Sequence, residues 1–423
     1  MRTASLTLIA CLLSPLVASA QSPRLTVQQL TTGPLHHFFG YIGHVQNVPW
    51  NKSGRYILTL RTPVRDHLPT ASEPAEIVLL DTHNKFAARV VEHSRAWNPQ
   101  QGTMLYWNPE AQETQFFFND RDEATNKVFC VLAEISATGP ARRIREYRFD
   151  DKPIGNGGVA QRGGKFLAIN YGRMGRLRRV TGYAGAYDWT VDKENPADEK
   201  HPADDGVFIV DVKSAEKRLL ASFAQLAAAL RTVEPAIDQQ ALFINHTLWS
   251  RDDSRVYFYV RGGWDKPGPR VNVPVVIDAD GGRLRPLKHF IGGHPEWQGG
   301  QRLIGVLDNE QVIYDCESMQ VVGKLGDKKL FPKPGDDIAL SPSGQWFVNG
   351  YRLGTENFYA FLRLNDKASV TSGPFNVRGW TDGDLRIDPS PNWNRQNNQI
   401  LISALANDKD LSRQLFLITL HTD

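Results

Sequence analysis

The sequence is poor in cysteine. It has three cysteines among 423 residues, too few for the disulfide framework that holds small secreted domains together. Cys11 falls in an N-terminal segment that we expect to be removed, so Cys130 and Cys316 remain in the mature chain. A bridge between these two residues is one alternative, but their wide spacing favours two buried free thiols.

Neither sign of charge is in large excess. The 49 Lys and Arg residues nearly balance the 46 Asp and Glu residues, and the formal net charge is +3. Because a nucleic-acid-binding domain usually has a strong basic footprint, we expect no nucleic-acid partner. With 41% hydrophobic and 22% charged residues, the composition is that of a folded protein. A mild attraction for an acidic substrate remains open.

Long apolar runs are absent except near the N-terminus. Arg2 precedes an apolar run over residues 6–17, which ends in the small residues Ala18, Ser19 and Ala20. This run is too short to cross a bilayer, and a small-x-small sequence follows it, so we interpret residues 1–20 as a cleaved signal peptide. A lipoprotein signal at Cys11 is a weaker alternative, because almost no apolar core would precede the cut. The sequence therefore predicts a periplasmic or extracellular protein with no membrane span.

Several common catalytic signatures are missing as well. The chain has no Ser-His-Asp order, no Cys-x-x-Cys pair, no Walker loop and no dinucleotide-binding glycine motif. Residues 155–158, which are rich in glycine, are interpreted as a turn. The sequence must therefore be interpreted from its repeats.

One local pattern occurs seven times. An aromatic or apolar residue precedes a polar turn of Ser, Asn, Asp or Gly, and a strand of large alternating residues follows. The copies cover residues 49–58, 105–118, 159–167, 248–258, 294–300, 340–346 and 391–397. Most copies start about 45 to 55 residues apart, which is typical of propeller blades with several short strands each. We therefore predict an all-β fold, a seven-bladed β-propeller over residues 21–423.

The gap between the third and fourth copies is about twice as long as the others. We expect an insertion over about residues 170–245, between the third and fourth blades. It contains a basic cluster (Arg173, Arg176, Arg178 and Arg179), and residues 222–233 have apolar side chains at helical spacing. Loops of all blades converge where a propeller channel opens, so the insertion is predicted to cover one face of the ring.

A set of short motifs accompanies the repeated turns in a fixed order: His36-His37-Phe38-Phe39-Gly40-Tyr41, Trp97-Asn98-Pro99-Gln100-Gln101-Gly102, Asn119-Asp120-Arg121, Asn170-Tyr171-Gly172-Arg173, Asn245-His246 and Arg386-Ile387-Asp388-Pro389-Ser390-Pro391. The turns resemble those of TolB-type propellers, and the order of the motifs resembles more specifically the secreted propeller lyases of the oligogalacturonate lyase group, with ulvan lyases as a related group. The similarity covers nearly the whole mature chain, although each motif is short.

The resemblance implies cleavage of uronic-acid oligosaccharides by β-elimination. This reaction needs a base for the proton beside the sugar carboxylate and a positive group that neutralises the carboxylate. His246 corresponds to the implied base, and His294 to the first ligand of the manganese ion. The other ligands normally come from a Gln-x-x-His-Pro-His-Pro sequence, which this chain lacks: Leu385, Asp388 and Ser390 stand at those positions.

Two arrangements could replace the lost ligands. His294 and Asp388, with Asp336 or Asp337, could hold a harder divalent ion such as Mn²⁺ or Ca²⁺. Alternatively Arg386 or Arg173 could pair directly with the sugar carboxylate, which we slightly favour. The identity of any cofactor is left open.

The remaining candidates complete a sugar-binding site. Tyr171 is a candidate proton donor to the leaving oxygen. Candidate substrate-binding residues, chosen because aromatic and amide groups suit polyhydroxy ligands, are His37, Asn98, Gln101, Arg121 and Tyr183. Two alternatives stay open: a non-catalytic TolB-like propeller that binds a glycan or a protein, and a hydrolase in which carboxylates such as Asp120, Asp337 and Asp388 converge.

Overall fold

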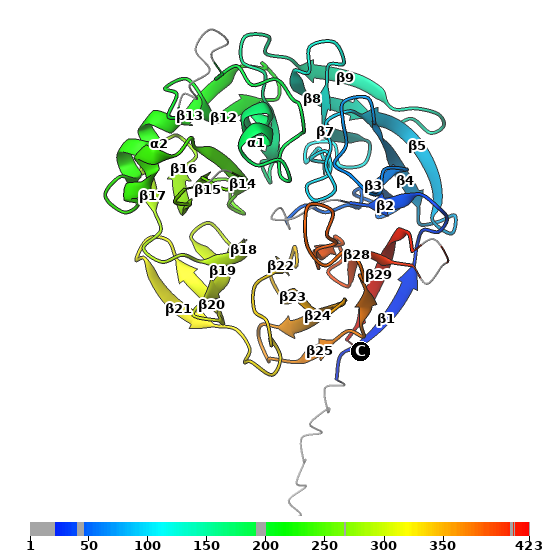
Figure 1. Ribbon diagram of the computed structural model, residues 1–423. Coiled ribbons are helices and arrows are strands. Elements are labelled where there is room, and N and C mark those ends of the chain that lie inside the picture. Colours follow the sequence, from blue (N-terminus) through cyan, green and yellow to red (C-terminus); the bar gives the residue numbers. More distant parts are fainter. Residues whose placement is uncertain are drawn as a thin grey trace, which may run out of the picture.

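The chain forms a ring of seven antiparallel sheets around a central channel (Figure 1). The computed structural model describes residues 22–39, 46–191, 200–265, 268–406, 409 and 411–422. Each sheet has four strands in its main path, and one carries an additional short strand. The prediction of a seven-bladed β-propeller is thus confirmed. The signal peptide predicted for residues 1–20 lies outside the described residues, as do Gly40 and Tyr41.

In each of the first three blades, successive strands along the chain follow one another from the channel outward. Their strands are β2 (His36–Phe38), β3 (Tyr56–Thr62), β4 (Ala75–Asp81) and β5 (Ala87–Ser94); β6 (Tyr106–Trp107), β7 (Gln115–Arg121), β8 (Val128–Glu134) and β9 (Arg142–Tyr147); and β10 (Gly155–Val159), β11 (Lys165–Ile169), β12 (Gly206–Asp211) and β13 (Lys217–Ser222).

The next three blades have the same order. Their strands are β14 (Phe243–Trp249), β15 (Arg255–Gly262), β16 (Val271–Asp278) and β17 (Arg285–Pro286); β18 (Gly292–Gln298), β19 (Arg302–Leu307), β20 (Glu310–Asp315) and β21 (Gln320–Lys324); and β22 (Asp337–Leu340), β23 (Trp346–Leu353), β24 (Glu356–Arg363) and β25 (Ser369–Thr371), with β26 (Phe375–Asn376) also paired to β24.

The two ends of the chain together build the seventh blade. It consists of β27 (Asn392–Trp393), β28 (Gln399–Leu405) and β29 (Arg413–His421), and β1 (Arg24–Gln29) adds its outermost strand. β1 pairs with β29 along six residues of each strand. Main-chain hydrogen bonds between the two ends therefore close the ring.

The repeated polar turn joins the first and second strands of a blade. The side chains of Asn51, Ser250 and Ser341 each accept a hydrogen bond from the backbone N–H five residues later, at Tyr56, Arg255 and Trp346. The tightest position of such a turn has positive φ, as at Gly54 (+79°) and Asp253 (+60°), which Gly and Asp tolerate better than most residues. This geometry explains the composition of the repeat.

Tryptophans at the ends of inner strands connect neighbouring blades. The indole N–H of Trp249 donates to the Gly158 carbonyl of the preceding blade, and Trp297 donates to Leu248 in the same way. Trp393 repeats the contact with Ala339. All three rings are buried, so each adds apolar contact as well as a satisfied polar group at a blade interface.

The predicted insertion is divided into two parts. β12 and β13 lie within residues 170–245 and are the outer strands of the third blade. One extra segment, which contains α1 (Tyr171–Leu177), therefore lies inside that blade, between β11 and β12. Only the second segment, with α2 (Phe223–Leu230) and a 3-10 helix (Pro235–Gln239), lies between the third and fourth blades as predicted.

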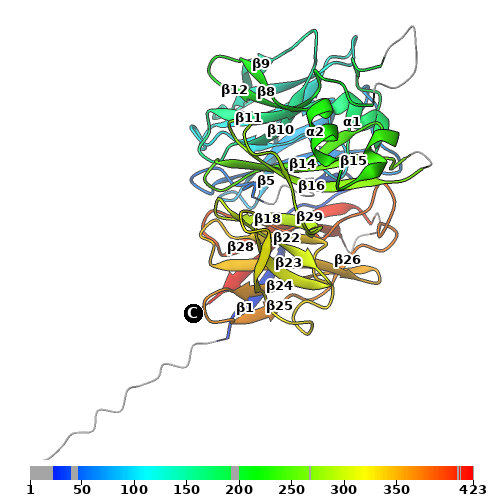
Figure 2. The same cartoon turned by 90° about the vertical axis from the view of Figure 1, so that its left-hand side faces the viewer.

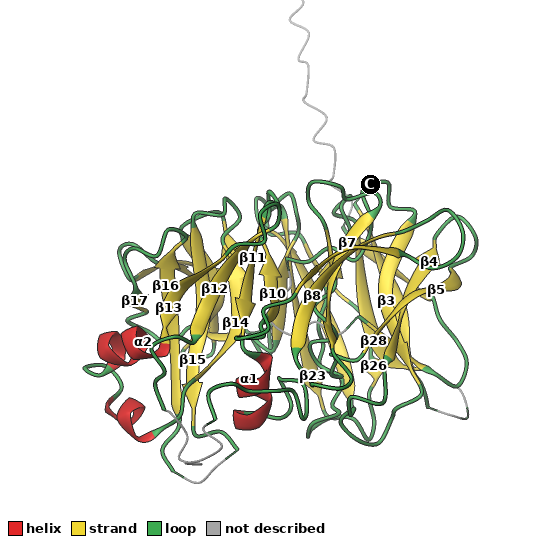
Figure 3. Ribbon diagram, turned by 90° about the horizontal axis from the view of Figure 1, so that it is seen from above, coloured by secondary structure: helices red, strands yellow, loops and turns green. Residues whose placement is uncertain are grey.

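Both helices lie toward the same face of the ring, and the described C-terminal end lies toward the other (Figures 2 and 3). α1 follows the second strand of its blade, and second strands are antiparallel to inner strands. The inner strands therefore begin on the helix-bearing face. Asn98, Gln101, Arg386 and Asp388 lie in segments that lead into these strands, and His37, His246 and His294 lie in the inner strands themselves.

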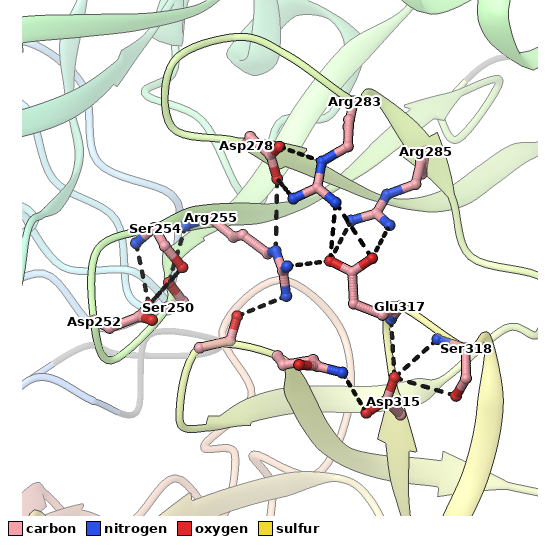
Figure 4. A network of polar contacts seen from close by, with 12 residues as sticks. Ser250, Asp252, Ser254, Arg255, Asp278, Arg283, Arg285, Asp315, Glu317 and Ser318 are labelled. Carbon is pink, nitrogen blue, oxygen red and sulfur yellow. Dashed lines mark hydrogen bonds and ion pairs between the residues drawn. The ribbon is translucent and has the colours of Figure 1, made fainter.

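An ionic network joins the fourth and fifth blades (Figure 4). Glu317 accepts hydrogen bonds from Arg283 and Arg285 and is ion-paired with Arg255. Arg255 also contacts Asp278 at 3.5 Å. The network involves turns at the ends of β16 and β20, away from the starts of the inner strands, so we assign it a structural role.

Candidate functional site

Two histidines face each other on the inner strands of adjacent blades. His246 lies in β14 and His294 lies in β18, and the centroids of their rings are 4.8 Å apart. His246 is buried, whereas His294 is partly exposed. The structure therefore brings together the two histidines that the sequence analysis assigned to the same site.

His246 occupies an irregular position in its strand. Its φ is +56°, and the register of β14 against β15 shifts between Asn245 and Leu248. The Asn245 side-chain oxygen accepts hydrogen bonds from the His246 N–H and from the Gln101 amide. Gln101 therefore contacts His246 indirectly, through Asn245, and helps to hold the strained backbone at this position.

His294 is held by the following blade. Its Nδ1 donates to the Asp336 carbonyl at 2.8 Å and is in ion-pair contact with the Asp337 carboxylate. Burial opposes protonation, but the charges of Asp337 and Asp388 outweigh it and raise the pKa of His294. Ser390 donates to the other oxygen of Asp337. His294 is therefore fixed in orientation and favours its charged form.

Arg386 and Asp388 form the neighbouring part of the site. The Arg386 Nε donates to Asp388 at 2.9 Å, and a terminal nitrogen donates to the Gln100 side chain at 2.9 Å. Burial raises the pKa of Asp388 against the opposing effect of Arg386. A cavity of about 20 Å³ beside these three residues has room for about one water molecule.

The arrangement does not fit a metal ion. Among the residues that the structure describes, no group of three His, Cys, Asp or Glu side chains is placed to hold one. The Nδ1 atom of His294 is directed at Asp336 and Asp337, and Asp388 is paired with Arg386. We therefore derive no step through manganese or calcium.

Two of the predicted catalytic residues lie in the insertion and not beside the histidines. Tyr171 is buried, its hydroxyl donates to the Asn156 carbonyl at 2.9 Å, and burial raises its pKa well above the usual range. Arg173 is buried as well and donates to the Thr190 hydroxyl and the Lys200 carbonyl. These positions favour structural roles, because both side chains already use their polar groups inside the fold.

The predicted sugar-binding residues are also mostly engaged in the fold. Tyr183 is fully buried and stacks on Tyr171 at 4.5 Å. Asn98 caps a turn by accepting from the Gln100 and Gln101 N–H groups. Arg121 donates to the Ala184 and Arg95 carbonyls.

His37 is a different case, because its ring is not committed in the same way. It is buried on β2, and burial, with Arg61 second, lowers its pKa to about 4. It is therefore neutral near neutral pH, and its Nδ1 has no hydrogen-bond partner in the described part of the chain.

Carboxylates do not all converge as the hydrolytic alternative requires. Asp120 is ion-paired with Arg143 at 2.8 Å, in the second blade. Asp337 and Asp388 do lie within electrostatic reach of each other, but Asp337 is in contact with His294 and Asp388 with Arg386. The two carboxylates are thus not available as the acid and the base of a hydrolase.

Comparison with solved structures finds similar folds at low sequence identity. No family model and no curated protein sequence matches the chain. TolB from Acinetobacter baumannii is 12% identical over 86% of this chain and 80% of its own, with a TM-score of 0.39. The β-propeller domain of the Trilobed protease from Pyrococcus furiosus is 12% identical over 94% and 95%, with a TM-score of 0.45.

A luciferin-regenerating enzyme is 11% identical over 74% of this chain and 90% of its own, with a TM-score of 0.37. The likeness is one of fold. At such identities it does not transfer an activity or a site, so the function has to be argued from the residues around His246 and His294.

Sequence reasoning missed two residues near the histidines. Tyr259 packs its ring 6.0 Å from the His246 ring, and the Arg261 guanidinium lies 4.3 Å from the Tyr259 ring centroid. Both residues are on β15, whose sequence is that of an ordinary alternating strand. The sequence contained no signal for them, because only the folding of the blade brings this end of β15 beside His246.

In the described residues no helix is long and apolar enough to span a membrane. Cys130 and Cys316 are both buried free thiols, which confirms the favoured prediction for them.

Proposed function

We propose that the chain is a polysaccharide lyase that cleaves uronic-acid-containing oligosaccharides by β-elimination at the channel mouth. The observation that carries the proposal is the pair of His246 and His294, with ring centroids 4.8 Å apart. Asp337 favours the charged form of His294. Two neighbouring imidazoles, one of which is held charged by a carboxylate, are suited to be base and acid in one reaction.

The elimination divides between the two rings. His246 accepts the proton from the carbon beside the sugar carboxylate, and the electron pair of that C–H bond becomes the new carbon–carbon double bond. The bond to the glycosidic oxygen breaks, and the His294 imidazolium supplies the proton that this oxygen takes. Atoms and charge balance, and no other reactant is required.

The carbanion-like transition state also needs positive charge near the sugar carboxylate. Arg386 can supply this charge, and Gln100 and Asp388 orient it. Arg173 is too deeply engaged with Thr190 and Lys200 to serve. We therefore assign charge neutralisation to Arg386, keep the arginine mechanism, and leave His294 the role of the acid.

An exported protein suits this substrate. Large acidic polysaccharides are met outside the cytoplasm, and the predicted signal peptide would deliver the enzyme to the periplasm or beyond. We propose that the partner is an acidic oligosaccharide or polysaccharide.

The test is turnover by wild type and His246→Asn on oligosaccharides of galacturonate, glucuronate, ulvan and alginate. Ultraviolet absorbance of the new conjugated double bond is the readout. Asn tolerates positive φ and should preserve the fold at this position. We expect the substitution to lower kcat at least about 100-fold, because a general base contributes on the order of 10²–10⁴.

Arg218→Gln provides a control with unchanged turnover, because this exposed arginine contacts the Ala279 and Asp280 carbonyls far from the histidines. Sugar cleavage without a double bond would overturn the elimination mechanism. Binding with no turnover by either form would favour a glycan-binding propeller without chemistry.

A further inference from the structure

Three guanidinium groups gather around one indole beside the histidines. Arg178, Arg261 and Arg270 lie 4.5, 5.0 and 5.0 Å from the Trp264 ring. They come from three separate segments: the end of α1, the end of β15 and the start of β16. Like charges repel, so such a cluster is costly unless something negative compensates it.

The cluster has fewer carboxylates than guanidinium groups. Asp265 pairs with Arg178 at 3.3 Å. In the part of the chain that the structure describes, no carboxylate pairs with Arg261 or Arg270. The local charge is therefore positive.

Arg261 is the central member. Its Nε donates to the Asn272 side chain at 2.9 Å, and its guanidinium packs on the Tyr259 ring at 4.3 Å. Burial lowers the pKa of Arg261 to about 10, so it keeps its charge near neutral pH. No described residue accepts a hydrogen bond from its terminal N–H groups.

Arg173, which is more deeply buried than Arg261, is satisfied differently. The guanidinium of Arg173 donates to three backbone or hydroxyl oxygens, those of Leu242, Thr190 and Lys200. Arg261 is only partly buried and its terminal N–H groups have no described acceptor, so they can receive an external one.

Arg261 is close to the proposed catalytic pair. Tyr259 lies between them, since its ring is 6.0 Å from His246 and carries Arg261 on it. The positive charge of Arg261 also acts on His294, where it opposes protonation. An anion bound at Arg261 would thus sit beside the reacting sugar, not on the far side of the ring.

We propose that Arg261, Arg178 and Arg270 form an anion-binding subsite for an acidic group on the sugar next to the one that is cleaved. The assignment of the ligand as an oligosaccharide rests on the proposed function, but the anion site itself does not. A guanidinium binds both carboxylate and sulfate oxygens. The subsite therefore predicts a preference for chains with acidic groups on successive sugars.

The experiment measures binding by calorimetry, so that it does not depend on turnover. The probes are oligogalacturonate, its methyl-esterified and hence neutral form, and sulfated ulvan oligosaccharides. If the wild type turns over a probe, the titration uses His246→Asn as the parent. Variants Arg261→Gln, Arg261→Lys and Arg270→Gln are compared with the parent and with Arg218→Gln.

We expect Arg261→Gln to weaken binding of an acidic probe about ten- to a hundredfold, because hydrogen bonds to charged groups contribute that much. Arg261→Lys should keep part of the affinity, and the exposed Arg270→Gln, which is safe for folding, should cost a few-fold. Neutral oligosaccharide should bind equally weakly to all forms. Comparing the carboxylated and sulfated probes identifies which acidic group is preferred.

Equal affinity of Arg261→Gln and Arg218→Gln would overturn the inference, as would a wild type that binds neither acidic probe. If Arg261→Gln loses affinity while the wild type shows no double-bond formation, the subsite stands and the lyase activity fails. If turnover is observed but Arg261→Gln binds and reacts normally, the reverse holds.

Discussion

The imidazole of His294 on the fifth blade is ion-paired with the carboxylate of Asp337 on the sixth. The contact crosses a blade interface, so the relative position of the two inner strands sets the charge of the histidine. Ser390 of the loop before the seventh blade donates to the same carboxylate. Segments of three successive blades thus determine the orientation and the charge of His294, which we assign to catalysis.

Replacing Asp337 should change the pH dependence of the reaction. Asp337→Asn removes the charge that raises the pKa of His294 against the effect of burial. The imidazolium would then persist only at lower pH. The alkaline limb of the kcat profile should move about one to two pH units toward acid.

Asp366→Asn is the matched control, since Asp366 pairs with Arg363 in a turn between β24 and β25. This substitution should leave the kcat profile unchanged.

The His294–Asp337 pair should also make the free energy of unfolding depend on pH. The pair stabilises the fold fully below the unfolded pKa of histidine, near 6.5, and this contribution is lost as pH rises through the raised pKa of the folded state. An unmoved alkaline limb in Asp337→Asn would remove His294 from the proton transfer.

Chelator should leave turnover unchanged. Of the ligands in the metal hypothesis, His294 is ion-paired with Asp337 and Asp388 with Arg386, and no three such groups among the described residues are placed to hold an ion. The measurement is the initial rate before and after dialysis against EDTA, with added Mn²⁺ and Ca²⁺ as separate arms. A rate that falls with EDTA and returns with one ion would restore the metal site and contradict the arginine mechanism.

Removal of the Tyr171 hydroxyl should affect stability and not catalysis. In Tyr171→Phe the Asn156 carbonyl loses one of its two donors inside the fold and keeps the Asn119 amide, so the free energy of unfolding should fall by about 1 kcal/mol. Urea unfolding measures this loss, and kcat of the folded enzyme should match the wild type. A fall in kcat of more than about tenfold without such destabilisation would return Tyr171 to the role of proton donor.

The network around Glu317 should stabilise the ring in a pH-dependent way. Arg285 lowers the pKa of Glu317 by hydrogen bonding, with Arg255 and Arg283 adding charge. The carboxylate therefore stabilises the fold above its unfolded pKa, and this contribution is lost as pH falls through the folded value. Glu317 is 30% exposed, so solvent screens the effect.

Glu317→Gln should thus cost about 1 kcal/mol at neutral pH and less in acid, measured by urea unfolding at each pH. Glu310→Gln is the control, because Glu310 has one partner, Lys324, and a more exposed side chain. It should change the free energy of unfolding by less than about 0.5 kcal/mol. Equal losses for both variants at all pH values would contradict the network.

The fold could be predicted because its signals are local. The polar turn that begins at Asn51 or Ser250 closes on a backbone N–H five residues later, so the composition of a short segment determines it. Repetition then determines the architecture, since a four-stranded unit can bury its faces only against further copies. The same reasoning misplaced part of the insertion, because β12 pairs with β11, and β13 with β12, beyond a long segment that no local pattern predicts.

The candidate site could be predicted only where it coincides with a motif. His246 and His294 stand in recognisable positions of the repeat, and the ring brings them together. Tyr171 and Arg173 stand in equally distinctive motifs, yet the helix α1 turns them into the interior. A motif specifies residue types in order along the chain and does not specify which side chains remain accessible.

The sequence alone thus determined the number of blades, the turn chemistry and two histidines of the mouth, all of which depend on neighbours along the chain. Only the tertiary structure decided which charges meet there. Asp337 lies beside His294 although 43 positions separate them in the sequence, and Arg261 lies on Tyr259 next to a ring from another strand. Electrostatic interaction depends on distance in space, and closure of the ring sets that distance.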